Sequence, residues 1–265
     1  MTTVSKTQGK NGDPCVIAGD EETYRFLCHL MTRSPDEHKQ IRRYPGDWHL
    51  LLHMAKALLK RHWGAGIEFV AGALGTDGKK SGDGSNYRRS HHHLTVMHKS
   101  MWQVSQEMYF KEHPPSDDMP MGDNRHVDGI VEWIRERAKH HKSFALWAQF
   151  LLEHFPAYMT FRTALRTENF MLRLDALRRI APIFFIRGTY RYQFLVADHL
   201  AEMARWTEAD LRILGELFSI SLGPDVFARM GMDERQEVAN RLLKTLTKKI
   251  LESLMGKMAP IAQFR

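Results

Sequence analysis

Two short apolar runs, one amphipathic helix between them and a second helix after them constrain the fold of this chain most strongly. The first run is Cys15–Ala18, and residues 23–31 then place apolar side chains at helical spacing. The second run, Ile41–Tyr44, precedes an apolar segment that predicts a helix over residues 50–62. Because parallel strands need a crossover helix between them, this order predicts an α/β core over residues 15–62.

The next part of the chain has helical patterns broken by loops rich in glycine and proline. We expect residues 63–215 to form an all-α insertion. Near its end, Thr207 stands three residues before Asp210, which is the pattern of a capping box at a helix N-terminus.

The last part of the chain is expected to return to the core. Phe218–Leu222 alternates like a strand and a long helix follows, so residues 216–256 form this returning unit. Residues 1–14 are expected to be a disordered N-terminus and residues 257–265 a tail. The predicted fold class is therefore mixed α/β and predominantly helical.

The composition, 43% hydrophobic and 26% charged, is that of a globular protein and excludes the disordered class. Lys plus Arg number 38 against 31 Asp plus Glu, and the resulting charge of +7 favours a polyanionic partner such as DNA. The two cysteines, Cys15 and Cys28, do not form a disulfide framework, so we expect a reducing, intracellular compartment. We expect no membrane segment, since no apolar stretch approaches about 18 residues, and no signal peptide.

Several polar side chains are candidates for a site, and each has a plain structural alternative. Asp20 ends a predicted strand, where ligands bind in open α/β sheets, yet an acid there also caps the next helix. His49 and His53 are spaced four apart, which is usable for zinc, but no Glu stands in the metalloprotease position and no further ligand motif follows, so a structural or solvent-facing pair is favoured. His91–His93 with His98 is expected to be a solvated face, because consecutive residues diverge by about 100° on a helix.

Three arginines on the predicted helical pair that ends at Ile180 are candidates for gripping phosphates. Arg162, Arg166 and Arg173 are expected on one helical stripe. Ordinary ion pairing with nearby acids is the alternative.

The motif Pro45-Gly46-Asp47-Trp48-His49, preceded by the strand that ends in Asp20, resembles the middle of the RNase H-like core of eukaryotic cut-and-paste transposases. In those enzymes, the Mutator-like group among them, a strand ending in the second catalytic Asp is followed by a helix and by a strand that runs into a signature closing with His. The chain is similar in sequence to an uncharacterised family of transposon-derived proteins of invertebrate and fungal genomes. The similar segments are Ile17–Asp20, Tyr44–Leu51, Lys60–Ile67, Ser85–His93, Leu165–Arg173, Ala181–Phe185 and Asp198–Ala201.

The resemblance implies roles for these residues. Asp20 is the second catalytic acid, and His49 orients the scissile phosphate or a metal-bound water. The third acid lies on a late helix in a pattern of Asp, three residues and Glu, which makes Glu237 the candidate. Further candidates for catalysis are Asp47, Glu234 and Glu168.

The chemistry that the resemblance implies needs divalent metal. Carboxylates hold two cations that activate the attacking oxygen and stabilise the leaving one, and Mg²⁺ or Mn²⁺ would be held by Asp20 and Glu237. The first acid would stand on a strand ahead of Cys15, which only a short loop-like segment precedes. We therefore expect an incomplete RNase H-like core without independent nuclease activity.

Three functions follow as hypotheses. The first is a fragment of a DDE-type, transposase-derived protein that binds DNA, in the nucleus rather than the cytoplasm. The second is a catalytically silent basic helical module that binds nucleic acid or protein. The third is a structural zinc-binding protein that uses His49 and His53. The oligomeric state stays open.

Overall fold

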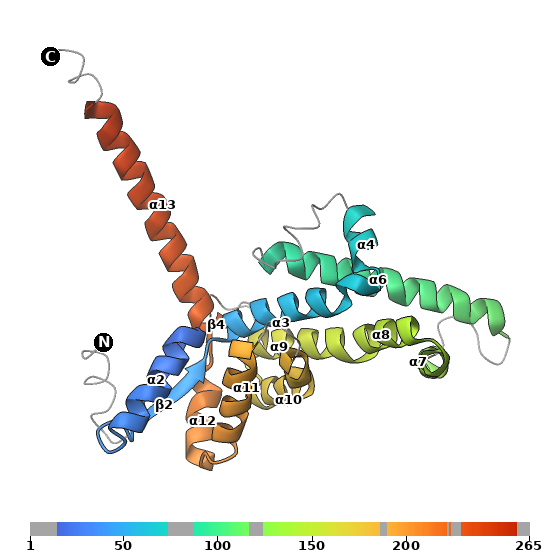
Figure 1. The fold of residues 1–265 in the computed structure, drawn as a ribbon, viewed down its shortest axis with the longest axis horizontal. Helices are drawn as coiled ribbons and strands as arrows, with labels where there is room; N and C mark the ends of the chain where they lie inside the picture. The colour runs from blue at the N-terminus through green and yellow to red at the C-terminus, as the bar shows by residue number, and fades with distance from the viewer. Residues whose placement is uncertain are drawn as a thin grey trace.

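The computed structural model describes residues 15–73, 87–116, 124–185, 190–221, 223 and 229–258. Strands β1 (Cys15–Gly19) and β2 (Ile41–Pro45) form a parallel two-stranded sheet, and helix α2 (Glu21–Arg33) connects them. In register, Cys15 lies opposite Ile41 and Gly19 opposite Pro45. The predicted order of strand, helix and parallel strand is confirmed (Figure 1).

Helix α3 (Asp47–His62) is the central helix of the core. Its side chains are buried around most of the circumference, among them Leu50, Met54 and Leu58, which are all 0% exposed. It packs against α6, α9 and the beginning of α13. A helix that is apolar on most sides is stable only inside such a bundle.

Within the described residues between Trp63 and Leu217 the elements are helices. Their bounds are η1 (Trp63–Ala65), α4 (Ile67–Ala73), α6 (Tyr87–Glu112), α7 (Arg125–His140), α8 (Lys142–Gln149), the π-helix η2 (Phe150–His154), α9 (Phe155–Arg166), α10 (Phe170–Ile180), the 3-10 helix η3 (Ala181–Phe185), α11 (Tyr190–Met203) and α12 (Glu208–Leu217). The predicted capping box is confirmed, because the Thr207 and Asp210 side chains each accept from the other's backbone N–H.

The two helices of the predicted pair are set at an angle by a break at residues 167–169. Glu168 has a φ of 56°, in the left-handed region, and the side chain of Asn169 caps α10 by accepting from Leu172 N–H. Arg162 and Arg166 therefore lie on α9 and Arg173 on α10. The expectation of one continuous arginine stripe is wrong, since the helix does not run through this turn.

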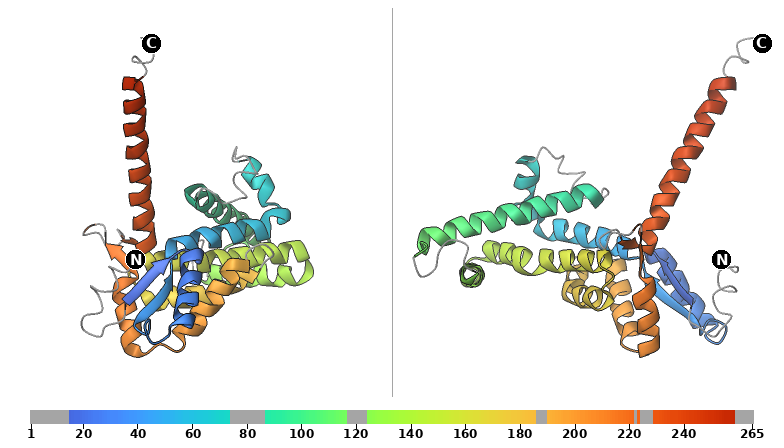
Figure 2. Two further views of the ribbon diagram at one scale, coloured as in Figure 1. Left: turned by 60° about the vertical axis from the view of Figure 1, so that its left-hand side comes forward. Right: turned by 180° about the vertical axis from the view of Figure 1, so that it is seen from behind.

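The predicted late strand exists but does not join the first sheet. Strand β3 (Ser219–Ser221) pairs antiparallel with β4 (Arg229–Gly231) in a separate two-stranded sheet. Helix α13 (Met232–Met258) follows directly, and its first turns contact α3 and β1. From Arg241 to Lys249 every side chain is exposed, and the helix projects away from the body (Figure 1 and Figure 2). The architecture is mixed α/β and predominantly helical, as predicted.

None of the helices in the described ranges is long and apolar enough to cross a membrane.

Candidate functional site

Two of the predicted site residues meet at the carboxyl ends of the parallel strands. Asp20 follows β1 directly, and His49 lies in the first turn of α3, just after β2. Both line one pocket of about 380 Å³. Its other lining residues are Glu21, Glu22, His53, Tyr190, Arg191 and Tyr192. The carboxyl end of parallel strands is where open α/β sheets bind ligands.

Asp20 is both the cap of α2 and a wall of this pocket. Its Oδ1 accepts a hydrogen bond from Thr23 N–H at 2.9 Å. Burial opposes ionisation of the carboxyl, but hydrogen bonds from Thr23 and Glu22 and the charge of His49 outweigh it and lower the pKa of Asp20. The carboxylate is thus ionised at neutral pH and largely committed to its own helix.

His49 is held by Asp233, an acid from the far end of the chain. One oxygen, Oδ2, lies 3.0 Å from His49 Nδ1 and accepts from His49 N–H at 3.1 Å. The other, Oδ1, accepts from Trp48 N–H at 3.1 Å. Asp233 therefore caps α3 from outside and favours the tautomer in which Nδ1 has the proton and Nε2 keeps its lone pair.

Two glycines make room for the Asp233 carboxylate. A Cβ at Gly46 would overlap Asp233 Oδ2, and one at Gly231 would lie 2.9 Å from Oδ1. The turn Pro45-Gly46 thus has a steric reason for its glycine, since any side chain there would displace the acid.

Asp47 and Arg173 form a buried ion pair. Arg173 is 0% exposed, and its Nη2 and Nε lie 2.6 Å and 3.1 Å from Asp47 Oδ1. Tyr44 OH donates to Asp47 Oδ2 at 2.7 Å, and Arg173 Nη1 lies 2.9 Å from His199 Nε2. Burial and the charge of Arg173 hold the pKa of His199 well below its usual value, so the ring is a neutral acceptor.

Because this ion pair is buried, the expected phosphate contact of Arg173 and the candidate catalytic role of Asp47 are both wrong. Arg173 cannot grip phosphates at the surface, because it lies in the interior and its donors are used by Asp47 and His199. Asp47, at 1% exposure with both oxygens hydrogen-bonded, is likewise a structural acid and not an accessible catalytic one.

The three candidates for the third acid, Glu168, Glu234 and Glu237, have other surroundings than the resemblance implies. Glu168 pairs with Arg229 at 2.5 Å, and Glu234 lies 4.0 Å from Arg166. Glu237 stands one turn beyond Asp233 on α13 and is half-buried. The acid that reaches His49 is Asp233, and the sequence signal for it is the first position of the same Asp-x-x-x-Glu pattern.

The histidines have individual partners. His53 stacks on Tyr192 with ring centroids 3.6 Å apart, and burial lowers its pKa to about 3. His91 Nδ1 lies 3.0 Å from Tyr158 OH, and His93 is buried, so the expected solvated face is wrong for these two. Among the described residues no group of three or more His, Cys, Asp or Glu side chains has an arrangement that could hold a metal ion.

A cluster of arginines surrounds Glu234 at the base of α13. Burial raises the pKa of Glu234, and the positive charges of Arg166, Arg162 and Arg241 act against it. Arg166 lies 4.0 Å from this carboxylate, and the negative charge of Asp233 adds to the effect of burial. Beyond this cluster α13 exposes Lys244, Lys248 and Lys249.

No family model, no curated protein and no solved structure matches this chain.

Proposed function

We propose that this protein is a transposase-derived protein of the RNase H-like, DDE type that binds DNA and does not cleave it by itself. The observation that supports it most is the meeting of Asp20 and His49 in one pocket at the carboxyl ends of β1 and β2. The resemblance of the Pro45–His49 motif implies that arrangement. A nuclear location is part of this proposal.

The return of the last helix to this end of the sheet also supports the proposal. The first turns of α13 contact β1 and α3, and Asp233 on that helix binds His49. The resemblance implies a late acidic helix beside the first two elements of the site, after an all-α insertion.

Lack of cleavage is proposed from how the carboxylates are already used. A two-metal site needs acids that share cations. Here both oxygens of Asp233 accept hydrogen bonds from α3, and the carboxylate of Asp20 accepts from Thr23 and Glu22. Arg191 lines the same pocket, and its Nη1 lies 3.9 Å from Glu21. Mg²⁺ and Mn²⁺ remain the ions to test, because they take oxygen ligands.

The DNA surface that we propose is the cluster of Arg162, Arg166 and Arg241 together with the exposed lysines of α13. The three arginines outnumber the two acids there, Glu234 and Asp233, by one positive charge, and α13 continues away from the body (Figure 2). Phosphates of a duplex interact with such rows of cations and release counterions on binding.

Binding is tested with a fluorescently labelled DNA duplex, whose anisotropy is titrated at several salt concentrations. We expect log affinity to fall linearly with log salt by about 0.9 per phosphate neutralised, and Arg166→Gln with Arg241→Gln to make the slope shallower. Arg178→Gln is the control, because it removes a positive charge from the exposed side of α10, outside the cluster. Affinity that does not respond to salt would overturn DNA binding.

Cleavage is tested separately, by incubating supercoiled plasmid with the protein and Mg²⁺ or Mn²⁺. We expect no nicking. Metal-dependent nicking that disappears in Asp20→Ala would overturn the claim of catalytic silence while leaving the assignment of the pocket intact.

A further inference from the structure

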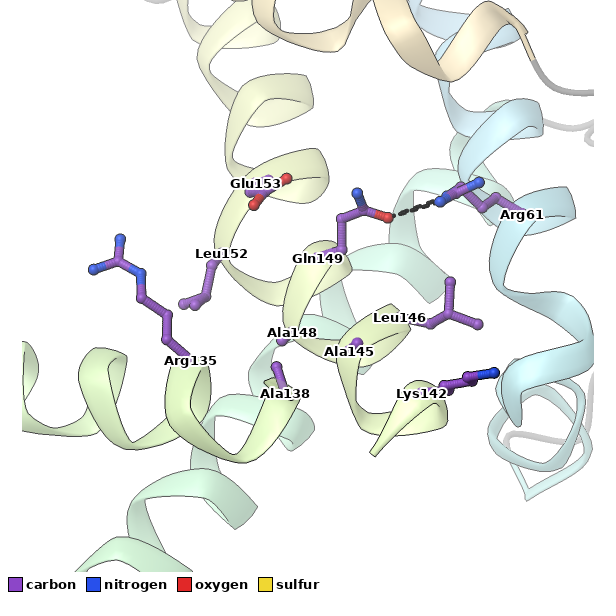
Figure 3. Close-up of a pocket in the computed structure, with 10 residues that line it drawn as sticks. All are labelled: Arg61, Arg135, Ala138, Lys142, Ala145, Leu146, Ala148, Gln149, Leu152 and Glu153. Atoms are coloured by element: carbon purple, nitrogen blue, oxygen red, sulfur yellow. Dashed lines mark hydrogen bonds between the residues drawn. The ribbon is translucent and has the colours of Figure 1, made fainter. Parts of the chain in front are cut away.

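A second pocket lies far along the insertion, between α3, α7, α8 and η2 (Figure 3). Its volume is about 470 Å³, which is within the range of small-molecule sites. The floor consists of small side chains, Ala138, Ala145 and Ala148, with Leu146 and Leu152 beside them. Such a floor offers a flat apolar surface.

The rim of this groove is positively charged. Arg61 and Lys142 stand on one side of it and Arg135 on the other, and Glu153 is the acid among the lining residues (Figure 3). Arg135 is 3.8 Å from Glu132, but both side chains are more than 60% exposed, so that pair neutralises little. Within the described part of the chain, neither Arg61 nor Lys142 has a carboxylate within ion-pair distance.

The guanidinium of Arg61 donates hydrogen bonds to Gln149 and has further N–H donors that these bonds do not use. Its Nε and Nη2 lie 3.3 Å and 2.8 Å from Gln149 Oε1, and the dashed contact in Figure 3 joins the two side chains across the groove. Among the described residues, Nη1 of Arg61 and the amide nitrogen of Gln149 donate no hydrogen bond to another side chain. A planar guanidinium fixed in this way is the preferred group for a phosphate.

The groove wall contains an irregularity of the backbone. Leu152 and Glu153 belong to the π-helix η2, which joins α8 to α9. Single-turn π-helices are rare and occur frequently at functional sites. Gln149 comes directly before this π-helix and faces Arg61, and Glu153 lies within it (Figure 3).

We propose that this groove binds an organic phosphate of mononucleotide size. The phosphate contacts Arg61 and the Gln149 amide, the ring lies on the alanine floor, and Lys142 and Arg135 supply the surrounding positive potential. The ligand is either a free nucleotide or one nucleotide unit of a single strand, since both present the same phosphate and ring. The site is separate from the Asp20–His49 pocket and from the arginines around Glu234.

Isothermal titration calorimetry with AMP, adenosine and inorganic phosphate tests the proposal, and a short deoxyadenosine oligonucleotide distinguishes the two sources. We expect AMP to bind at least about tenfold more tightly than adenosine, and Arg61→Gln to remove that preference. Ala145→Leu should fill the floor and weaken AMP with every charge retained. Arg178→Gln is the matched control outside the groove, and thermal unfolding of each variant confirms folding.

The outcomes distinguish a free nucleotide, a nucleotide unit of a single strand, and no phosphate site in this groove. Binding of AMP that both groove variants weaken supports a free nucleotide, and binding of the oligonucleotide alone, with the same two losses, supports a strand. The proposal is overturned if the affinities are unchanged in both variants, if AMP binds but no more tightly than adenosine, or if neither AMP nor the oligonucleotide binds. Arg61→Gln leaves Arg166 and Arg241 in place, so duplex binding tests the proposed function independently.

Discussion

Asp233 and His49 are 184 positions apart in the chain, yet one carboxylate oxygen of Asp233 contacts both the backbone N–H and the ring Nδ1 of His49. The other oxygen accepts from Trp48 N–H. One side chain thus caps the central helix, orients the site histidine and joins α13 to α3.

Replacing Asp233 should therefore cost stability. We expect Asp233→Ala to lower the free energy of unfolding by about 1–3 kcal/mol, since two N–H groups of α3 lose their partner. Asp233→Asn should lose less, because an amide oxygen still caps a helix. Urea unfolding measures both. Glu237→Gln, one turn further along α13, is the control, and an equal loss there would argue against a specific role for Asp233.

Gly46 should not tolerate a side chain. A Cβ there overlaps Asp233 Oδ2, so Gly46→Ala should lower the free energy of unfolding by about 1–3 kcal/mol. In the double variant with Asp233→Ala the added cost of the methyl group should shrink, because the clashing oxygen is gone. Gly72→Ala, which meets open space inside α4, should be neutral or stabilising by up to about 1 kcal/mol. Additive losses in the double variant would contradict the clash.

The buried pair of Asp47 and Arg173 should show strong coupling. Arg173→Met leaves a carboxylate in the interior without its cation, and we expect a loss of about 3–5 kcal/mol. Adding Asp47→Asn to that variant should restore part of the loss. A double-mutant cycle by urea unfolding gives the coupling energy. A coupling energy near zero would mean that the two charges do not depend on one another.

Acid should destabilise the fold through its buried histidines, and His53 offers a direct test. Burial lowers its pKa from 6.5 to about 3, so between these values the unfolded chain binds a proton that the folded protein does not. The contribution to stability is complete above pH 6.5 and declines as the pH falls, by at most about 1.4 kcal/mol per pH unit. His53→Phe keeps the stack on Tyr192 and removes the proton site, so its unfolding free energy should fall less steeply from pH 7 to pH 5.

The matched control for that measurement is His92→Phe, at an exposed position of α6. It should leave the slope as in the unmodified protein. If His53→Phe and His92→Phe have the same pH dependence, His53 is not held neutral by its surroundings.

Glu234 should restrain DNA binding. Its carboxylate lies among Arg166, Arg162 and Arg241, so Glu234→Gln should raise the affinity for a duplex several-fold and steepen the salt dependence by up to about 0.9 in the logarithmic slope. Glu216→Gln, exposed on α12, makes the same change in net charge elsewhere. Equal gains in the two variants would point to net charge alone and not to this cluster.

The α/β segment could be predicted because its signals are local. Short apolar runs, an acid after Gly19 and a helical period between the strands are readable in one window, and the structure confirms them. The capping box of Thr207 and Asp210 is local in the same sense. The placement of Asp20 and His49 at one end of the sheet then follows from parallel pairing.

The partners of the site residues could not be predicted in this way. Asp233 reaches His49 only because the β3–β4 hairpin directs α13 back to α3, and nothing near position 49 indicates it. The charge of Arg173 makes it a candidate for a phosphate contact, although it shares the helical stripe of Phe170, Leu174 and Leu177, which are buried. That periodicity is the signal that would have located it in the core.

The pairing of Asp47 with Arg173 also has a consequence for the order of folding. It closes a loop of 126 residues, and burial of either charge without the other is unfavourable. We therefore expect the α/β segment and the helices after it to consolidate in one cooperative step. A chain from which residues 63–215 were deleted would leave its central helix with an unneutralised acid at its first position, so we expect the two segments to fold as one unit.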